Sequence, residues 1–461
     1  MPCTTYRKML ESEIIEQKYC NVCRCYDREQ EGASMRLSLK NIGKIKEASV
    51  EINGITVIAG ENDTGKSTVG RALFSVFNSF CDIDVRIREE RVESIVTILK
   101  SLFRSRPFRM AITFDWEEAA LDMIGQAELL KEDASLIRKK LTGFTEQLGE
   151  DVQKYIEYEE LDQNAMRIKE LLHVSDDEIF KSILARRLDK EFNGQICNIF
   201  SDLSDVAGEI GLQIKDEDML LTIDANNVID RKGSIHLHTE AVYLDDPFIL
   251  DEPQNIFLPY RANSVDHRTD LKLKLACGKE ETNVIEKIVI NNKFENIYSK
   301  IEAVCSGELV RDKRYGYDYR GKDNGKALNV RNLSTGLKTF AILKVLLQNG
   351  VIEYNGTIIL DEPEIHLHPE WQLLFAELIV LMQKEFSMHI LLNTHSPYFL
   401  RAIQVYSARY EIADRCNYYL SEATETGEYA YITDVTDDIE RIYRKLSRPL
   451  QQLEDERWQN D

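Results

Sequence analysis

The sequence predicts an α/β fold in which a buried parallel sheet carries chemically active residues at the carboxyl ends of its strands. Three short apolar runs, at residues 55–59, 357–360 and 390–393, have the length and composition of buried strands. The first leads through a glycine-rich loop into a helix, and the other two end in acidic residues and in a histidine. Because ligands of parallel α/β sheets bind beyond the carboxyl ends of the strands, these three ends form the candidate site.

Composition excludes several classes of protein. The chain has 461 residues, of which 43% are apolar, so it can form a sizeable core and is neither wholly disordered nor fibrous. Its 79 acidic and 58 basic residues give a formal net charge of −21, which leaves nucleic-acid binding to local basic patches. The longest apolar run, residues 373–382, contains Glu377, and no apolar signal segment opens the chain. We therefore expect a cytoplasmic protein without membrane spans.

Residues 1–34 are expected to form a disordered leader, because they lack a periodic apolar face. Cys20, Cys23 and Cys25 have a spacing that could place three thiolates on one zinc ion, with Cys3 as a distant fourth ligand. No histidine lies near them in the sequence, and nine cysteines in the whole chain fit a reducing compartment. We favour the leader over the zinc site, and translation starting at Met35 stays open.

Regular patterns begin at Met35. Residues 36–41 and 47–52 alternate apolar with polar side chains, as half-buried strands do, and residues 55–59 form a buried strand. Residues 66–80 predict a helix with one apolar face, made by Val69, Leu73, Val76, Phe77 and Phe80.

The rest of the chain divides into a helical segment and a second strand-rich segment. Residues 86–205 carry apolar positions at helical spacing without sustained heptads, which predicts a short helical hairpin or small bundle. Strands are expected at 211–223 and 234–244, a helix at 283–304, and a hairpin between 311–319 and 327–332. After residue 411 we expect a strand or two and a closing helix at 437–453, which Pro449 interrupts.

The loop at residues 60–67 matches the G-x-x-x-x-G-K-[ST] pattern, in which backbone N–H groups wrap nucleotide phosphates at a helix N-terminus. Its position between a buried strand and an amphipathic helix is the context that this pattern requires. Lys66 is expected to contact the β- and γ-phosphates, and the Ser67 hydroxyl to ligate Mg²⁺. The ATP-binding residues are then Gly60, Glu61, Asn62, Asp63, Thr64, Gly65, Lys66, Ser67 and Thr68.

Asp361 and Glu362 follow the buried strand at 357–360. An Asp-Glu pair alone is usually a solvated turn, but a phosphate-binding loop in the same chain favours a catalytic interpretation. Asp361 would then hold the hydration shell of Mg²⁺, and Glu362 would act as the general base on the attacking water.

Ser334 and Gly336 open another predicted helix, which ends near Gly350. Alone, this Ser-x-Gly pattern would indicate only helix capping. The order of the motifs along the chain favours a functional interpretation over capping. The phosphate loop is followed by this pattern, then by the acidic strand end, and then by a strand ending in His395.

This ordered set resembles the ABC-type ATPase heads, and among them the branch that includes RecF, SMC proteins and the overcoming-lysogenization-defect (OLD) ATPases. The resemblance covers residues 35–85 and 210–410. It is carried by the segments LSLKNIGKIKEASVEINGITVIAGENDTGKST, LSTGLK, ILDEPEIHLHPEW and NTHSPYFL. It implies a two-lobed, P-loop NTPase head of the ABC type at 35–85 and 206–461, with 86–205 as a helical insertion.

The resemblance also implies how such a head works. Ser334, Gly336 and Lys338 would contact the ATP bound to a second copy, so that a homodimer, or a higher even oligomer, sandwiches the nucleotides with Mg²⁺. His395 would sense the γ-phosphate. A glutamine that connects the two lobes is usual in the family, and Gln254 is the candidate, against an ordinary surface glutamine.

Other polar clusters allow two interpretations. His366 with His368, and His236 with His238, could bind metal, but neither pair has a nearby third ligand. We prefer packing at the dimer seam for the first pair and a strand face for the second. A basic stretch with interleaved Phe103 and Phe108 could bind nucleic acid, could dock a protein, or could be a solvated helix. Its basic residues are Arg86, Arg88, Arg91, Lys100, Arg104, Arg106 and Arg109.

The leading functional hypothesis is an ATP-hydrolysing dimeric switch in an antiphage defence system, acting with a separate effector, such as a nuclease. The alternatives are a RecF- or SMC-like DNA-repair ATPase, the nucleotide-binding subunit of a transporter, and a scaffold that does not hydrolyse ATP. The size of the insertion disfavours the transporter, and Glu362 disfavours the scaffold. Residues 396–461 are too few for the TOPRIM nuclease domain of OLD-type proteins, so we expect this chain not to cut nucleic acid.

Overall fold

The computed structural model describes residues 34–102, 115–147, 158–199, 206–224, 226–253, 265–276, 295–311, 316–322 and 326–460. The candidate zinc cysteines, Gln254, Phe103 and Phe108, and Arg104, Arg106 and Arg109 lie outside these residues.

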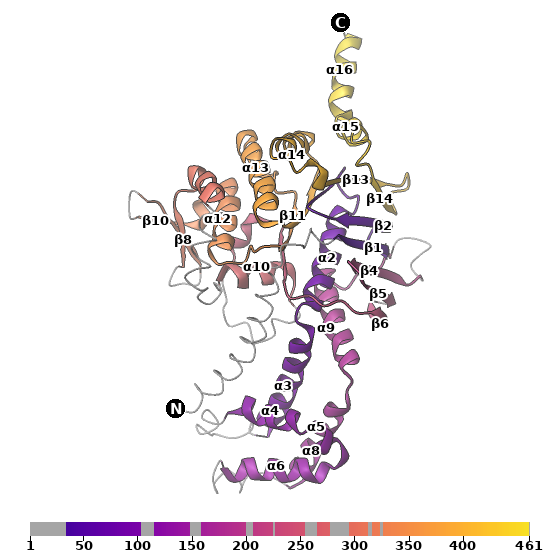
Figure 1. Cartoon of the computed structure of the whole chain (residues 1–461), viewed down its shortest axis with the longest axis vertical. Coiled ribbons are helices and arrows are strands. Elements are labelled where there is room, and N and C mark those ends of the chain that lie inside the picture. Colours follow the sequence, from indigo (N-terminus) through magenta and orange to yellow (C-terminus); the bar gives the residue numbers. More distant parts are fainter. Residues whose placement is uncertain are drawn as a thin grey trace.

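One mixed sheet organises the described residues (Figure 1), and the α/β fold class is confirmed. Its eleven described strands run in the order β6-β5-β4-β1-β2-β14-β13-β3-β12-β11-β7. They are β1 (Met35–Ile42), β2 (Ile45–Ile52), β3 (Ile55–Gly60), β4 (Gly208–Ile214), β5 (Glu217–Asp224), β6 (Asn227–Gly233), β7 (Ala241–Leu244), β11 (Thr357–Asp361), β12 (His389–Thr394), β13 (Cys416–Ala423) and β14 (Ala430–Asp434).

The sheet has an antiparallel half and a parallel half. Strands β6, β5, β4, β1 and β2 pair in antiparallel fashion, whereas β13, β3, β12, β11 and β7 are parallel. The parallel half aligns the carboxyl ends of β3, β11 and β12, as the sequence predicts. The expected strand at 211–223 is instead two strands, because the chain turns at Lys215, whose φ is 54°.

Helices cover both faces of the parallel half, because side chains on each strand alternate between two cores. Ile55, Val57 and Ala59 of β3 face the core formed with α12 (Thr335–Gln348), α13 (Pro369–Phe386) and α14 (Pro397–Arg409). Ile58 faces the opposite core, which includes α2 (Lys66–Phe80) and α9 (Asp176–Glu191). The predicted apolar face of 66–80 is buried in this second core.

The described part of residues 86–205 is mainly helical. Figure 1 shows α3 (Ile83–Ser101) and α9 extending away from the sheet, with further helices gathered at their far end. These are α4 (Trp116–Gly125), α5 (Ala127–Glu132), α6 (Ala134–Gln147) and α8 (Tyr158–His173). They share with the distal part of α3 a third core, which contains Ile95, Leu99, Met123, Ile137 and Ile168. A helix pair therefore carries a small bundle, which combines the two predicted forms.

The remaining elements complete the parallel half. Helix α10 (His267–Ala276) and residues 295–304, which are also helical, pack into the core beneath α12. Strands β8 (Glu308–Arg311), β9 (Tyr317–Arg320) and β10 (Ala327–Asn329) form a small antiparallel sheet, which contains the predicted hairpin. The expected closing helix is divided at Ser447 into α15 (Glu440–Leu446) and α16 (Arg448–Asn460). In the described residues, no helix is both long enough and apolar enough to cross a membrane.

Candidate functional site

The phosphate-binding loop connects β3 to α2 in the conformation that the pattern requires. Gly65 has a φ of 85°, a left-handed conformation that favours glycine, and a Cβ there would lie 2.6 Å from Ile45 Cδ1. Helix α2 starts at Lys66 without a side-chain cap and without an acidic residue in its first turn. Its N-terminus therefore offers backbone N–H groups and a positive dipole end to an anion.

Lys66 is buried inside this loop. Its Nζ donates hydrogen bonds to the carbonyl oxygens of Gly60, at 3.1 Å, and Glu61, at 2.7 Å. It also lies 3.4 Å from Glu362 Oε1. The ammonium group is therefore held at the loop, where it can exchange carbonyl contacts for phosphate oxygens without a large movement.

Asp361 ends β11, and hydrogen-bond donors from the two neighbouring strands fix its carboxylate. Asn393 Nδ2 of β12 donates to Asp361 Oδ1 at 2.9 Å, and the Tyr243 hydroxyl of β7 donates to Asp361 Oδ2 at 3.0 Å. Both donors leave lone pairs on each oxygen available for a further contact. Neither Tyr243 nor Asn393 was identified from the sequence, although both lie near the ends of apolar strands.

Glu362 lies between the phosphate loop and His395. Its φ is 48°, an uncommon conformation for this residue, and its backbone N–H donates to Asn393 O at 3.0 Å. His395 Nδ1 lies 3.2 Å from the same carboxylate oxygen that faces Lys66. The contact with His395 holds the pKa of Glu362 below its ordinary value, with Lys66 adding to the effect, and Glu362 in turn raises the pKa of His395. Glu362 is therefore ionised and able to accept a proton.

Glu364 is a second carboxyl group at this strand end that the sequence did not single out. It is 2% exposed, and burial raises its pKa. The Thr394 hydroxyl donates to Glu364 Oε1, and the backbone N–H of His395 donates to the same oxygen at 3.4 Å. Glu364 thus holds the turn that carries His395.

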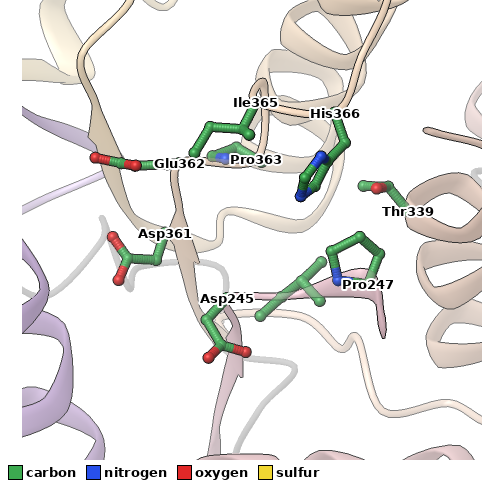
Figure 2. A pocket seen from close by; sticks show the side chains of 9 residues that line it. Asp245, Pro247, Thr339, Asp361, Glu362, Pro363, Ile365 and His366 are labelled. Carbon is green, nitrogen blue, oxygen red and sulfur yellow. The ribbon is translucent and has the colours of Figure 1, made fainter. Parts of the chain in front are cut away.

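A small pocket of about 30 Å³ opens beside the acidic strand end (Figure 2). Asp245, Asp361 and Glu362 line it on one side, and Pro247, Thr339 and His366 line the other. His366 contacts the ring of Phe248 at a centroid distance of 5.5 Å, whereas His368 caps α13 by accepting from Glu370 N. Packing at a dimer seam stays a prediction for this pair.

The predicted signature residues lie at the start of α12. Ser334 is exposed at the N-cap without a side-chain capping bond, so its hydroxyl is available to a partner. Gly336 is buried against Trp371 and the carbonyl of His366. Lys338 is only 1% exposed, and its Nζ lies 2.7 Å from both carboxylate oxygens of Asp251. Lys338 therefore pairs within its own chain, and its contact with the ATP of a second copy stays a prediction.

Two further sequence interpretations change in the structure. His236 and His238 precede β7 and do not share a strand, because only residues 241–244 of the expected strand pair with β11. His236 contacts Glu217, and His238 contacts Asp82. In the basic stretch, Arg86 pairs with Glu240, and Arg91 pairs with Asp176. Arg91 therefore joins two segments of the insertion, and Arg86 joins the start of the insertion to the residue before β7. Both guanidinium groups already have partners in the chain, which weakens the nucleic-acid hypothesis. Arg88 and Lys100 are exposed.

The donor set fits Mg²⁺. Ser67 supplies a hydroxyl and Asp361 a carboxylate whose orientation is fixed, and oxygen ligands of this kind suit a hard divalent cation. The described residues contain no group of three or more His, Cys, Asp or Glu side chains arranged to hold a metal, so Mg²⁺ at this site would also need phosphate and water oxygens as ligands.

The chain is similar to several known proteins. It is 32% identical over 92 residues to the "Retron Vc95 probable ATPase" of Vibrio cholerae serotype O1 biovar El Tor. This match spans 17% of the present chain and 17% of the length of that relative. Among solved structures, the SMC head domain from Thermotoga maritima matches at 10% identity and a TM-score of 0.36, covering 87% of this chain and 98% of that one.

A second solved structure is the Smc head domain with an extended coiled coil bound to the C-terminal domain of ScpA, derived from Pyrococcus furiosus. It matches at 13% identity and a TM-score of 0.31, covering 92% of this chain and 99% of that one. The family described as "AAA ATPase domain" matches residues 35–400, which contain the phosphate loop, the acidic strand end and His395. The chain therefore belongs to the AAA ATPase domain family.

Proposed function

We propose that this protein is an ATP-hydrolysing switch whose catalytic sites form between two copies. The position of Glu362 supports this proposal most strongly, because one carboxylate oxygen lies 3.4 Å from Lys66 Nζ and 3.2 Å from His395 Nδ1. A base between the phosphate-binding lysine and a histidine is suited to activate water beside a γ-phosphate.

Each residue has one role in this mechanism. The loop and Lys66 bind and orient the phosphates, and Ser67 and Asp361 hold Mg²⁺, which neutralises charge on the phosphates when it is bound. Glu362 takes the proton of the attacking water. His395 orients Glu362, and Glu364 holds the turn on which His395 lies. Ser334 and Gly336 of the second copy complete the site.

The Glu362→Gln variant tests this function. Glutamine keeps the shape of the side chain but cannot accept the proton, so we expect ATP binding to persist while turnover falls by at least about 10²-fold. Closed dimers should then accumulate with ATP, which size-exclusion chromatography with light scattering would measure. Glu425→Gln, at an exposed turn, is the matched control. Normal turnover in the Glu362→Gln protein would remove the assignment of the base.

We further propose that the switch acts in antiviral defence with a separate effector. The similarity to a retron ATPase over 92 residues supports this context, as does the resemblance to OLD-type ATPases. Purification from cells that co-express the neighbouring genes would identify the partner. Recovery of DNA-repair proteins, and no effector, would favour the RecF- or SMC-like alternative.

A further inference from the structure

Tyr243 contacts the candidate site, but the proposed mechanism gives it no role. It lies on β7 and is buried, and its hydroxyl reaches across to Asp361 Oδ2 at 3.0 Å. The same hydroxyl packs against α2 one turn after Lys66, where a Cβ on Gly70 would lie 3.1 Å from it. The phenol end thus fills the space between the phosphate-loop helix and the Asp361 carboxylate.

His267 supports the other side of the Tyr243 ring. The two rings stack with centroids 4.3 Å apart and planes 26° apart. His267 is itself held at three points: its Nδ1 lies 2.6 Å from Glu191 Oε1, its backbone N–H donates to Glu191 Oε2 at 3.0 Å, and its Nε2 lies 3.0 Å from Asp245 Oδ2. Glu191 is the last residue of α9, so this contact joins the helical insertion to His267.

We propose that Tyr243 is a positioning residue for the magnesium-binding Asp361, and that His267 and Glu191 hold Tyr243 so that the end of α9 sets the affinity for Mg²⁺. The proposal rests on the proposed function, because it assigns Mg²⁺ to Asp361. A continuous set of contacts joins the insertion to the site, from Glu191 through His267 and Tyr243 to Asp361.

The geometry favours positioning over a merely structural role for the hydroxyl. A tyrosine needed only to fill the core could be a phenylalanine, whereas this hydroxyl contacts one carboxylate oxygen while Asn393 contacts the other. Two donors on two oxygens fix the rotation of a carboxylate. Hydrogen-bond donors behind a metal ligand change metal affinity by roughly 10- to 100-fold when they are removed.

The test measures nucleotide binding with and without Mg²⁺ in the full-length protein. A fluorescent ATP analogue would be titrated in EDTA and then over a series of Mg²⁺ concentrations, so that the Mg²⁺-dependent gain in affinity is separated from binding by the loop. Tyr243→Phe removes only the hydroxyl. We expect its affinity in EDTA to equal that of the wild type and its apparent Mg²⁺ affinity to fall roughly tenfold or more.

Two further variants complete the design. Glu191→Gln should weaken the apparent Mg²⁺ affinity by a smaller factor, because it loosens His267 and leaves the Tyr243 hydroxyl in place. Tyr419→Phe is the matched control, since that buried hydroxyl accepts from Glu51 N at 2.9 Å, away from Asp361. Thermal unfolding of each variant shows whether it is folded.

The measurements test the role of Tyr243 and the link to α9 separately. An unchanged Mg²⁺ dependence in folded Tyr243→Phe protein overturns the positioning role, and an unchanged dependence in Glu191→Gln overturns the link to α9. A loss of affinity in EDTA for Tyr243→Phe would show general damage to the loop, which also contradicts the proposal. If the wild type shows no Mg²⁺-dependent nucleotide binding, the proposed function itself fails.

Discussion

At the scale of single residues, His267 is a histidine held between two carboxylates and almost closed off from water. It is 6% exposed, and Glu191 and Asp245 lie on either side of its ring. Burial alone would lower its pKa, but the contacts with Asp245 and Glu191 outweigh burial and raise the pKa to about 9. The charged form therefore contributes to the stability of the fold at neutral pH.

The stability of the protein should depend on the protonation of His267. Because the pKa is raised from about 6.5 in the unfolded chain, this contribution is fully present below pH 6.5 and is lost as pH rises through about 9. We expect the free energy of unfolding to fall by roughly 3 kcal/mol over this range. Urea denaturation between pH 6 and pH 9 would measure it.

His267→Gln should flatten this dependence, whereas His238→Gln, at an exposed histidine that pairs only with Asp82 in the described residues, should keep it. Comparing the variants removes the effect of other groups, such as the thiols of Cys81 and Cys416. These thiols titrate near pH 9 only in the unfolded chain, because burial raises their pKa values to about 12 and about 11 in the fold. Equal pH dependence in wild type and His267→Gln would contradict the prediction.

At the scale of elements, an ion pair fixes the start of α12 to η2 (Pro247–Asp251), which follows β7. Lys338 Nζ contacts both oxygens of Asp251 and lies 5.0 Å from the centre of the Phe248 ring. The signature helix is thereby tied to the strand that carries Tyr243 and leads to Asp245. Movement of β7 should move the residues that a second copy would contact.

Breaking this ion pair should be more harmful than replacing it. Asp251→Ala leaves the buried ammonium of Lys338 without its partner and should destabilise the fold by about 3 kcal/mol. The double variant Lys338→Met with Asp251→Leu should recover much of this loss, because it removes both charges. Urea denaturation at pH 7 measures both. Asp437→Ala, at an exposed loop, is the control, and a double variant less stable than Asp251→Ala would contradict the argument.

At the scale of the whole molecule, the candidate site lies at the carboxyl ends of the parallel strands, beside several exposed side chains. Ser334 is exposed without a capping bond, and Ile365 and Tyr398 are large apolar side chains exposed near the acidic strand end and His395. A surface that combines an incomplete phosphate site with exposed apolar residues is suited to meet a second copy.

Complementation between two inactive variants would test the composite site. Lys66→Ala removes a charge-assisted phosphate contact, and Ser334→Arg places a bulky charge where the second copy would bind ATP. Each protein alone should be inactive, but a mixture should recover up to about a quarter of wild-type turnover, since random pairing gives half mixed dimers with one intact site each. No recovery despite mixed dimers shown by crosslinking would exclude the sandwich.

Local patterns in the sequence determined much of the fold and of the site. The strand, loop and helix at residues 55–80 were predictable because neighbouring residues define them: an apolar run, glycines, and one apolar face at helical spacing. The same holds for Asp361 and His395, since a buried strand that ends in a polar residue presents it at the edge of the sheet. Their roles stay predictions.

Only the tertiary structure brought together residues whose partners are distant in the chain. Tyr243 lies 118 residues before Asp361, and Glu191 lies 76 residues before His267. Nothing local distinguishes these side chains from ordinary core or surface residues, because their chemistry arises from strand order and helix packing. Lys338 was likewise not predictable from its neighbours in the sequence. Its place in the signature pattern predicts a contact with the phosphate bound to a second copy, whereas packing of α12 against η2 places its ammonium group on Asp251. The order of the strands and the packing of the helices decided these contacts, and no sequence period encodes them.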